Sequence, residues 1–252
     1  MTQSFTKRPN EHRAAEAEAA GLQWLGEASE CVPRVVAVDT QRNELQTAYI
    51  ESVAPTAKTA RRAGAELARI HAAGAPAFGA PPAGWQGPNY IGTQQQDCIP
   101  TDDWGEFYTR QRVEPFAHAA AQAGTLADDE LADVLRACQA IRAAEWSVKP
   151  ARIHGDLWTG NLLFGSDGPA FIDPAAHGGH PQTDLAMLDL FGAPYFDEIV
   201  AGYHEVSPLP KNWREFIPMH QLHPLAVHAL THGSAYAGPL QRAAQVTTQL
   251  LS

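Results

Sequence analysis

The spacing of hydrophobic and polar residues changes along the chain, and this change predicts its elements. Over the first 54 residues, short apolar or β-branched runs flank one Ala-rich amphipathic stretch. This pattern predicts a strand, a helix and two further strands. The expected ranges are 4–7 for the first strand, 11–26 for the helix, and 32–39 and 45–53 for the other strands. Pro55 follows the last strand and closes it.

From residue 55 onward, the apolar residues recur mainly at helical spacing. Helices are expected over residues 58–73, after Asp102 or Asp103, and from Asp128 onward. A Gly- and Pro-rich connection over residues 74–100 separates the first two. The C-terminal helices are expected over residues 183–191, 195–203, 213–236 and 239–251, with Pro218 and Pro224 breaking or kinking the third.

One part of this helical region has a different pattern. Short apolar pieces at residues 152–154 and 161–164 flank a polar turn. The run Gly165-Ser166-Asp167-Gly168 then predicts a tight hairpin turn before a return strand over residues 169–172. Such a hairpin places Asn161 at the start of one strand and Asp173 at the end of the other. Both side chains can therefore reach one metal ion.

The polar turn contains the residue types that phosphoryl transfer requires. Asn161 follows Asp156 by five positions, as in the catalytic loop of protein kinases, and Asp173 follows the hairpin. We predict that Asp156 accepts the proton of a substrate hydroxyl, while Asn161 and Asp173 hold Mg²⁺ and ATP. A turn rich in Asp and Asn without a function is the alternative. Gly155 replaces the Arg of protein kinases, which indicates a small-molecule substrate.

Four further residues near this turn are interpreted from their positions in the sequence. His154 is expected to form hydrogen bonds with the backbone around the turn. Asp184 opens a predicted helix, and it is expected either to cap that helix or to hold the catalytic loop. His177 and His180 flank two glycines just after Asp173. Exposed loop histidines or substrate contacts are favoured for them over a metal site.

The N-terminal region contributes candidates for nucleotide binding. Lys7 ends the first predicted strand and is a candidate for the lysine that contacts the α- and β-phosphates. Glu18, on the following helix, is its predicted ion-pair partner. A solvated lysine near a chain terminus is the simpler alternative. Tyr49 and Ile50, within the last predicted strand of this region, are also assigned to the nucleotide.

Composition narrows the class of protein further. The chain of 252 residues is 44% hydrophobic and 18% charged, which is typical of a soluble globular protein. Its net charge of −10 argues against a nucleic-acid or anionic-membrane partner, and no apolar run approaches the length of a membrane span. Cys31, Cys98 and Cys138 are scattered, and the first ten residues lack a targeting signal. We expect a cytoplasmic monomer or weak dimer.

The run from His154 through Trp158 to Asn161 resembles the fructosamine (ketosamine) kinase family, whose relatives include aminoglycoside phosphotransferases and choline kinases. Trp158 and the pair Gly160-Asn161 separate this family from its aminoglycoside relatives. Further similar segments are Asp173 to Ala175, Thr183 to Met187, Asn89 to Gly92, Asp103 to Arg112, and Gln221 to Gly233. The resemblance therefore covers nearly the whole chain.

The resemblance implies an α+β, protein-kinase-like fold with two lobes. Residues 1–54 would form a small β-rich lobe, and residues 55–252 a larger, mainly helical lobe with the catalytic loop and the metal-binding hairpin. It also implies transfer of the ATP γ-phosphate to a sugar hydroxyl of a ketosamine, on a small amine or on a protein lysine. Trp158 and His180 are candidate substrate contacts.

The chain departs from the family pattern at two places. The family's Gly-rich strand–turn–strand over the phosphates has no matching segment here, where only Met1 to Phe5 are available for it. We therefore expect a truncated small lobe, which leaves a weakened or non-catalytic nucleotide- or sugar-binding relative as an alternative. Residues 177–182 replace a more Tyr- and acid-rich segment on the substrate side. A kinase of another hydroxyl, of the aminoglycoside or choline kind, is a further alternative against which Trp158 argues.

Overall fold

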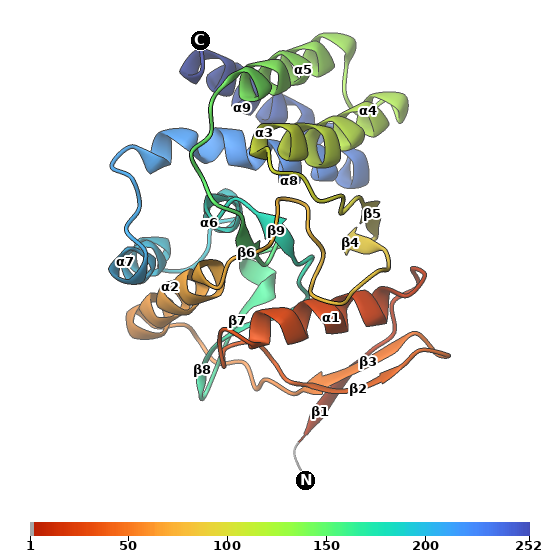
Figure 1. Ribbon diagram of the computed structural model, residues 1–252, viewed down its shortest axis with the longest axis vertical. Coiled ribbons are helices and arrows are strands. Elements are labelled where there is room, and N and C mark those ends of the chain that lie inside the picture. The colour runs from red at the N-terminus through yellow and green to blue at the C-terminus, as the bar shows by residue number, and fades with distance from the viewer. Residues whose placement is uncertain (1–2) are drawn as a thin grey trace.

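The computed structural model of the protein describes residues 3–252, and a small sheet lies at one end of a mainly helical body (Figure 1). Over these residues the sheet contains antiparallel strands in the order β1-β3-β2. Their bounds are β1 Ser4–Lys7, β2 Val35–Asp39 and β3 Glu44–Ala48. Helix α1 (Ala14–Gly26) packs against this sheet, so the predicted order of strand, helix, strand and strand is confirmed.

Three elements of this region are shorter than predicted, and one of them, strand β2, begins at Val35 rather than at residue 32. Helix α1 begins at Ala14 rather than at residue 11, because the preceding Arg13 has a left-handed backbone (φ 57°). Strand β3 ends at Ala48 rather than at residue 53. Beyond it the chain leaves the sheet, and the amide of Val53 donates to the carbonyl of Phe164 in strand β7 (Leu162–Gly165) at 2.6 Å. Residues 49–53 therefore connect the sheet to the rest of the molecule.

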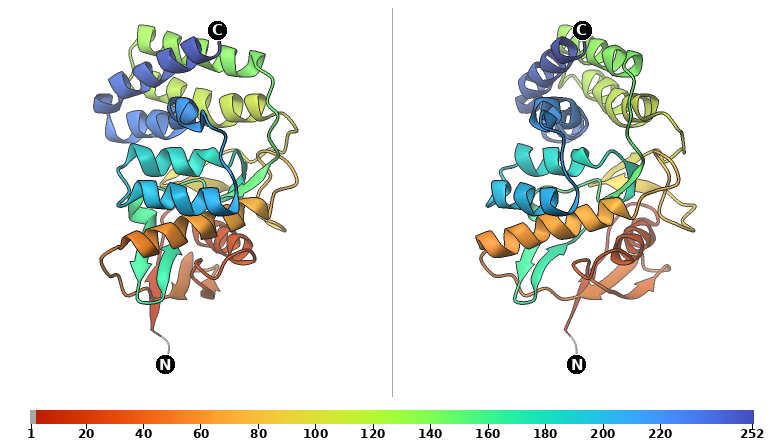
Figure 2. Two further views of the ribbon diagram at one scale, coloured as in Figure 1. Left: turned by 90° about the vertical axis from the view of Figure 1, so that its left-hand side faces the viewer. Right: turned by 60° about the vertical axis from the view of Figure 1, so that its left-hand side comes forward.

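Helices α2 (Ala57–Ala72) and α7 (Phe196–Val206) lie side by side (Figure 2). They meet through their backbones, since a Cβ atom added at Gly64 would lie 1.8 Å from the carbonyl oxygen of Ile199. A Cβ atom added at Gly202 would likewise lie 1.8 Å from the carbonyl oxygen of Arg61. Only glycine permits an approach this close at either position.

The connection over residues 74–100 contains a short hairpin that its composition did not predict. Its strands are β4 (Asn89–Ile91) and β5 (Gln94–Gln96). Asp103 then caps α3 (Trp104–Phe107) by accepting a hydrogen bond from the amide of Glu106 at 2.7 Å, as predicted. A π-helical segment, Tyr108–Val113, leads into α4 (Glu114–Gln122), and α5 (Asp128–Ala143) follows.

Short strand pairs interrupt the helices where the hydrophobic pattern changes. Strand β7 forms the predicted hairpin with β8 (Gly168–Phe171), and β6 (Ala151–Ile153) pairs with β9 (His177–Gly179). The remaining helices are α6 (Gln182–Leu190), α8 (Ile217–His232) and α9 (Ala237–Leu250). Pro218 lies in the first turn of α8, and the helix runs through Pro224 without a break. Among the described residues, no helix is both long and apolar enough to cross a membrane.

The buried apolar side chains form two clusters. The first joins α1, β3 and α2 to the β7–β8 hairpin, α6 and α7, through residues such as Leu22, Leu45 and Phe164. The second lies among α3, α4, α5, α8 and α9. The N-terminal sheet therefore shares a core with the segment that carries the catalytic turn. The division at residue 54 stays a prediction.

Candidate active site

The catalytic turn follows strand β6, and Gly155 determines its shape. This residue has a φ of +82°, in the region that favours glycine, and a Cβ atom there would lie 2.4 Å from the carbonyl oxygen of Ala175. A larger residue such as the Arg of protein kinases therefore cannot occupy this position without moving the backbone. The turn ends in a 3₁₀ segment, Thr159–Asn161, which leads directly into β7.

Asp184, in the first turn of α6, holds the catalytic turn from inside the protein. Its two carboxylate oxygens accept hydrogen bonds from the amides of His154 (2.8 Å) and Gly155 (2.9 Å). His71 of α2 lies 3.0 Å away from the same carboxylate. Burial alone would raise the pKa of Asp184, but the hydrogen bonds that it accepts from His71 and from the amide of Gly155 lower it below its usual range. These contacts agree with the expected role of Asp184 in holding the loop, and Asp184 does not cap α6.

His154 connects the two arms of the site, as predicted. Its Nε2 atom lies 2.9 Å from the carbonyl oxygen of Ile172, to which it donates, and its Nδ1 atom accepts from the amide of Asp156 at 3.3 Å. This pattern requires the neutral imidazole with the proton on Nε2. Burial lowers the pKa of His154, which agrees with a neutral ring. These contacts connect His154 to the backbone on both sides of the turn.

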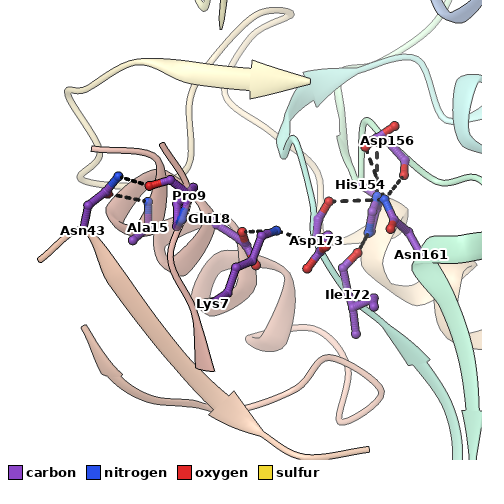
Figure 3. Close-up of polar contacts among 10 residues, drawn as sticks. All are labelled: Lys7, Pro9, Ala15, Glu18, Asn43, His154, Asp156, Asn161, Ile172 and Asp173. Atoms are coloured by element: carbon purple, nitrogen blue, oxygen red, sulfur yellow. Dashed lines mark hydrogen bonds and ion pairs between the residues drawn. The ribbon is translucent and has the colours of Figure 1, made fainter. Parts of the chain in front are cut away.

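Asp156 and Asn161 face each other across the turn (Figure 3). The amide Nδ2 of Asn161 donates to the backbone oxygen of Asp156 at 2.8 Å and to its carboxylate at 3.2 Å. Burial, and next the charge of Asp173, raise the pKa of Asp156 to about 7. A carboxylate with a pKa near neutrality is suited to accept a proton from a hydroxyl group.

Lys7 forms ion pairs with two carboxylates at the edge of the sheet (Figure 3). Its Nζ atom lies 2.8 Å from Glu18 of α1 and 3.0 Å from Asp173. The predicted pair of Lys7 and Glu18 is therefore present. Burial lowers the pKa of Lys7, but the two carboxylates outweigh it, so its pKa is raised. Burial raises the pKa of Glu18 to about 7, against the effect of Lys7.

Two cavities meet at this ionic cluster. An apolar cavity of about 240 Å³ is lined by Tyr49 and Ile50, which follow β3. Side chains of β3, α1 and the β7–β8 hairpin also line it. A more polar cavity of about 390 Å³ contains Asp156, Trp158 and Asn161. Lys7, Glu18 and Asp173 line both cavities. The predicted site residues other than His154, His180 and Asp184 thus lie around one continuous region.

The outer wall of the polar cavity was not predicted from the sequence. It is formed by the loop between β1 and α1 and by the β4–β5 hairpin. Asn43 holds that loop by donating to the carbonyls of Pro9 (2.8 Å) and Glu11 (2.7 Å). The Tyr90 hydroxyl donates to the carbonyl of His12 at 2.9 Å, which joins the hairpin to the loop. The run Asn89 to Gly92 was the available indication, but nothing in it specifies a contact with the loop.

The structure separates the two residues assigned to the substrate. Trp158 is 41% exposed and lines the polar cavity, in agreement with a substrate contact. His180 is buried, and its ring packs against those of Trp104 (centroids 5.1 Å apart) and His220 (4.4 Å). His177 is also buried, in β9. The expectation of exposed loop histidines is therefore wrong, because the two-glycine segment pairs with β6 and enters the core.

The residues present fit a magnesium ion. Asn161 uses its Nδ2 atom toward Asp156, so its Oδ1 atom remains available as a ligand. Asp173 supplies a carboxylate from a left-handed backbone (φ 53°), a strained conformation that often occurs at functional sites. Over the described residues, no group of three or more His, Cys, Asp or Glu side chains could hold a metal. This sparse oxygen donor set is what Mg²⁺ uses when substrate phosphates complete its coordination.

Relatives of the chain are kinases. A family model described as fructosamine kinase matches residues 3–252. A protein named as a probable ketoamine kinase from Enterococcus faecium is 30% identical over 230 residues, which cover 90% of this chain and 80% of the relative. Probable ketoamine kinase YniA from Escherichia coli is 33% identical over 224 residues, with coverages of 87% and 76%.

Solved structures agree with these relatives. The crystal structure of a candidate fructosamine-3-kinase from Thermobifida fusca matches with a TM-score of 0.91 and 42% identity, covering 98% of this chain and 86% of that one. A choline/ethanolamine kinase family protein from Mesorhizobium loti shares the fold alone, with a TM-score of 0.60 at 17% identity and coverages of 96% and 82%. The predicted kinase-like fold and phosphotransferase class are confirmed. A match along the whole described chain shows that the protein belongs to the fructosamine kinase family.

Proposed function

We propose that the protein transfers the γ-phosphoryl group of ATP to a sugar hydroxyl of a ketosamine, carried by a small amine or a protein lysine. The observation that carries this proposal is that Asp156 shares a cavity with Asn161 and Asp173, and that Lys7 joins this cavity to an apolar one. The apolar cavity suits a nucleobase, and the polar cavity suits a sugar. Family membership and the printed names of the relatives support a ketosamine as acceptor.

On the nucleotide side, the base would lie in the apolar cavity against Tyr49 and Ile50. Lys7 would donate hydrogen bonds to the α- and β-phosphates, and Glu18 would hold the Lys7 side chain in place at 2.8 Å. Asn161 Oδ1 and the Asp173 carboxylate would hold Mg²⁺. When bound, the ion neutralises the charge of the phosphates and orients the γ-phosphoryl group.

On the acceptor side, Asp156 would accept a hydrogen bond from the reacting hydroxyl and then its proton. Its pKa of about 7 means that a substantial fraction is ionised at neutral pH. Asn161 Nδ2, at 3.2 Å, fixes the orientation of the carboxylate. The exposed ring of Trp158 would pack against the sugar and exclude water from one side.

The proposal is tested by incubating the protein with fructosyl-lysine, ATP and Mg²⁺ and measuring ADP release. We expect ketosamine-dependent turnover, and we expect Asp156→Asn to lower kcat by about 10²- to 10⁴-fold. Asp189→Asn is the matched control, because this exposed carboxylate lies on α6 outside the cavities and accepts a hydrogen bond only from Gln221. Full activity of Asp156→Asn would show that the base is wrongly assigned.

Other acceptors and a binding-only role give different results in the same assay. If an aminoglycoside or choline supports faster ADP release than fructosyl-lysine, the acceptor class is wrong. If ATP raises the melting temperature but no acceptor yields ADP, the protein binds nucleotide without transferring phosphate. Turnover that requires the ketosamine excludes both.

A further inference from the structure

A small internal cavity lies behind the catalytic turn and shares no residue with the two cavities of the active site. Gly155 of the catalytic turn forms part of its wall. Trp104 of α3, Arg112 of the π-helical segment and His223 of α8 also line it. Further polar or aromatic lining comes from Phe107, Tyr108, His177, His180 and Thr183. Its volume is about 10 Å³, which is room for a single water-sized ligand.

Arg112 is buried beside this cavity without an ion-pair partner within 4.0 Å in the described part of the chain, although the charge of the more distant Asp97 carboxylate acts on it. Its Nη1 atom donates to the carbonyls of Asp97 (2.6 Å) and Gln111 (3.0 Å), and its Nη2 atom reaches only the thiol of Cys98 at 3.7 Å. Over residues 3–252, no carboxylate oxygen lies within 4.0 Å of its guanidinium nitrogens. A guanidinium stays protonated in proteins, so a full positive charge is buried here. Buried charges are normally paired, which raises the question of a counter-ion.

The histidines around Arg112 do not supply negative charge or further positive charge. Burial, and next the positive charge of Arg112, lower the pKa of His177 and His223 well below the usual value, so both rings are neutral. The Nδ1 atom of His177 donates to the carbonyl of Ala175 at 2.7 Å, and its Nε2 atom therefore accepts from Arg112 at 3.4 Å. Arg112 alone carries a full charge among these rings.

The free polar atoms of the wall include N–H donors. The indole Nε1 of Trp104 and the Nε2 atom of His223 are buried and have no hydrogen-bond partner among the described residues. The Nδ1 atom of His180 accepts from the amide of Gln182 at 3.1 Å, which leaves its Nε2–H as a donor. A water molecule would also need acceptors for its own two hydrogens. An anion needs donors alone.

We propose that this cavity binds one chloride-sized monovalent anion, held by the guanidinium of Arg112 and the indole N–H of Trp104. The size of the cavity excludes polyatomic anions such as phosphate and carboxylates. The anion balances the buried charge of Arg112. Because Gly155 forms part of the wall, the anion also supports the catalytic turn from the side opposite to the substrates.

Crystals soaked in sodium bromide test the site directly. We expect an anomalous difference peak between Arg112 and Trp104. A water molecule at this position, with no anomalous peak, would overturn the proposal. In solution, replacing acetate by chloride at constant ionic strength should raise the melting temperature by roughly 3–5 °C for each tenfold increase in chloride above its Kd. Equal melting temperatures in the two salts would also contradict it.

Matched substitutions test the donors. Trp104→Phe removes the indole N–H but keeps an aromatic ring, and it should weaken the chloride dependence of the melting temperature. Trp146→Phe is the control, because this indole donates to the carbonyl of Ile141 at 2.8 Å and does not line the cavity. Arg112→Met should abolish the dependence. If Arg112→Met fails to fold, the tryptophan pair and the bromide peak still decide, and equal chloride dependence in both tryptophan variants would contradict the proposed donor.

Discussion

The two sides of the active site are held by different kinds of contact. The catalytic turn is fixed by hydrogen bonds from its own backbone amides to Asp184, which is 1% exposed, and by His154. The nucleotide side depends on ion pairs of Lys7, whose side chain is 33% exposed. The turn is therefore set by the protein alone before any substrate binds. The charges of Lys7 and Asp173 instead compensate each other. In the proposed function, phosphates and a metal ion would replace these contacts.

The largest effect on stability is expected on the side of the catalytic turn. Asp184→Ala should lower the free energy of unfolding by about 3–5 kcal/mol, because it leaves two backbone amides and His71 without an acceptor in the core. Urea denaturation followed by tryptophan fluorescence measures the loss. Asp189→Ala on the same helix is the control and should stay within about 0.5 kcal/mol of the wild type. A similar small change for both variants would show that the turn does not depend on Asp184.

On the proposed nucleotide side, we expect a large loss of activity and only a small change in stability. Lys7→Met should lower kcat/KM for ATP by about 10²-fold or more, because a phosphate donor is lost. The free energy of unfolding should change by less than about 1 kcal/mol, because the pair is partly exposed. Arg8→Met is the matched control, since the neighbouring Arg8 pairs with Glu44 outside both cavities. If Lys7→Met unfolds the protein but Arg8→Met does not, the contrast between the two sides is wrong.

The pKa of Asp156 predicts how stability changes with pH. In the folded protein it is raised from 3.8 to about 7. The stabilising contribution of this carboxyl group is therefore complete below about pH 4 and is lost as the pH rises through 7. Asparagine does not titrate, so Asp156→Asn should melt a few degrees above the wild type at pH 8 and show a smaller difference at pH 5. Calorimetry at both pH values, with Asp189→Asn beside it, measures this. A constant difference at all pH values would contradict the raised pKa.

The smallest effect is expected at the mouth of the polar cavity. Trp158→Ala should raise the KM for the ketosamine by about 5- to 20-fold, because an aromatic contact is lost, and should leave the KM for ATP unchanged. Steady-state kinetics with each substrate varied in turn separates the two constants. A rise in the KM for ATP instead would place Trp158 on the nucleotide side. Phe191→Leu, which removes the ring beside Trp158, serves as a milder companion variant.

The spacing of residues in the sequence was enough to select the candidate residues for phosphoryl transfer. Asp156, Asn161 and Asp173 were assigned because a hairpin turn fixes their relative position. Lys7 and Glu18 were assigned because a strand followed by a helix brings them to one edge. The same reasoning missed His71, which appears only as part of a helical face, although it binds Asp184 and the Tyr203 hydroxyl.

The other assignments were harder to make because they depend on contacts between segments that lie far apart in the sequence. His177 and His180 flank two glycines, and Pro181 follows them, which is a composition typical of a loop. Pairing with β6 nevertheless places this segment inside the protein. Asn43, in the turn between β2 and β3, holds the loop that carries Pro9, and no local pattern indicates this contact. These positions depend on which segments meet in three dimensions, which local periodicity does not specify.

The close contact between α2 and α7 has a consequence for how this protein tolerates mutation. Gly64 and Gly202 set the position of the two helices along each other. His71 lies about two turns after Gly64, and its partner Tyr203 directly follows Gly202. Any side chain at either glycine would shift that register and move His71 away from Asp184. Gly64 and Gly202 line neither cavity of the active site, yet selection for activity should act on them as strictly as on Asp156.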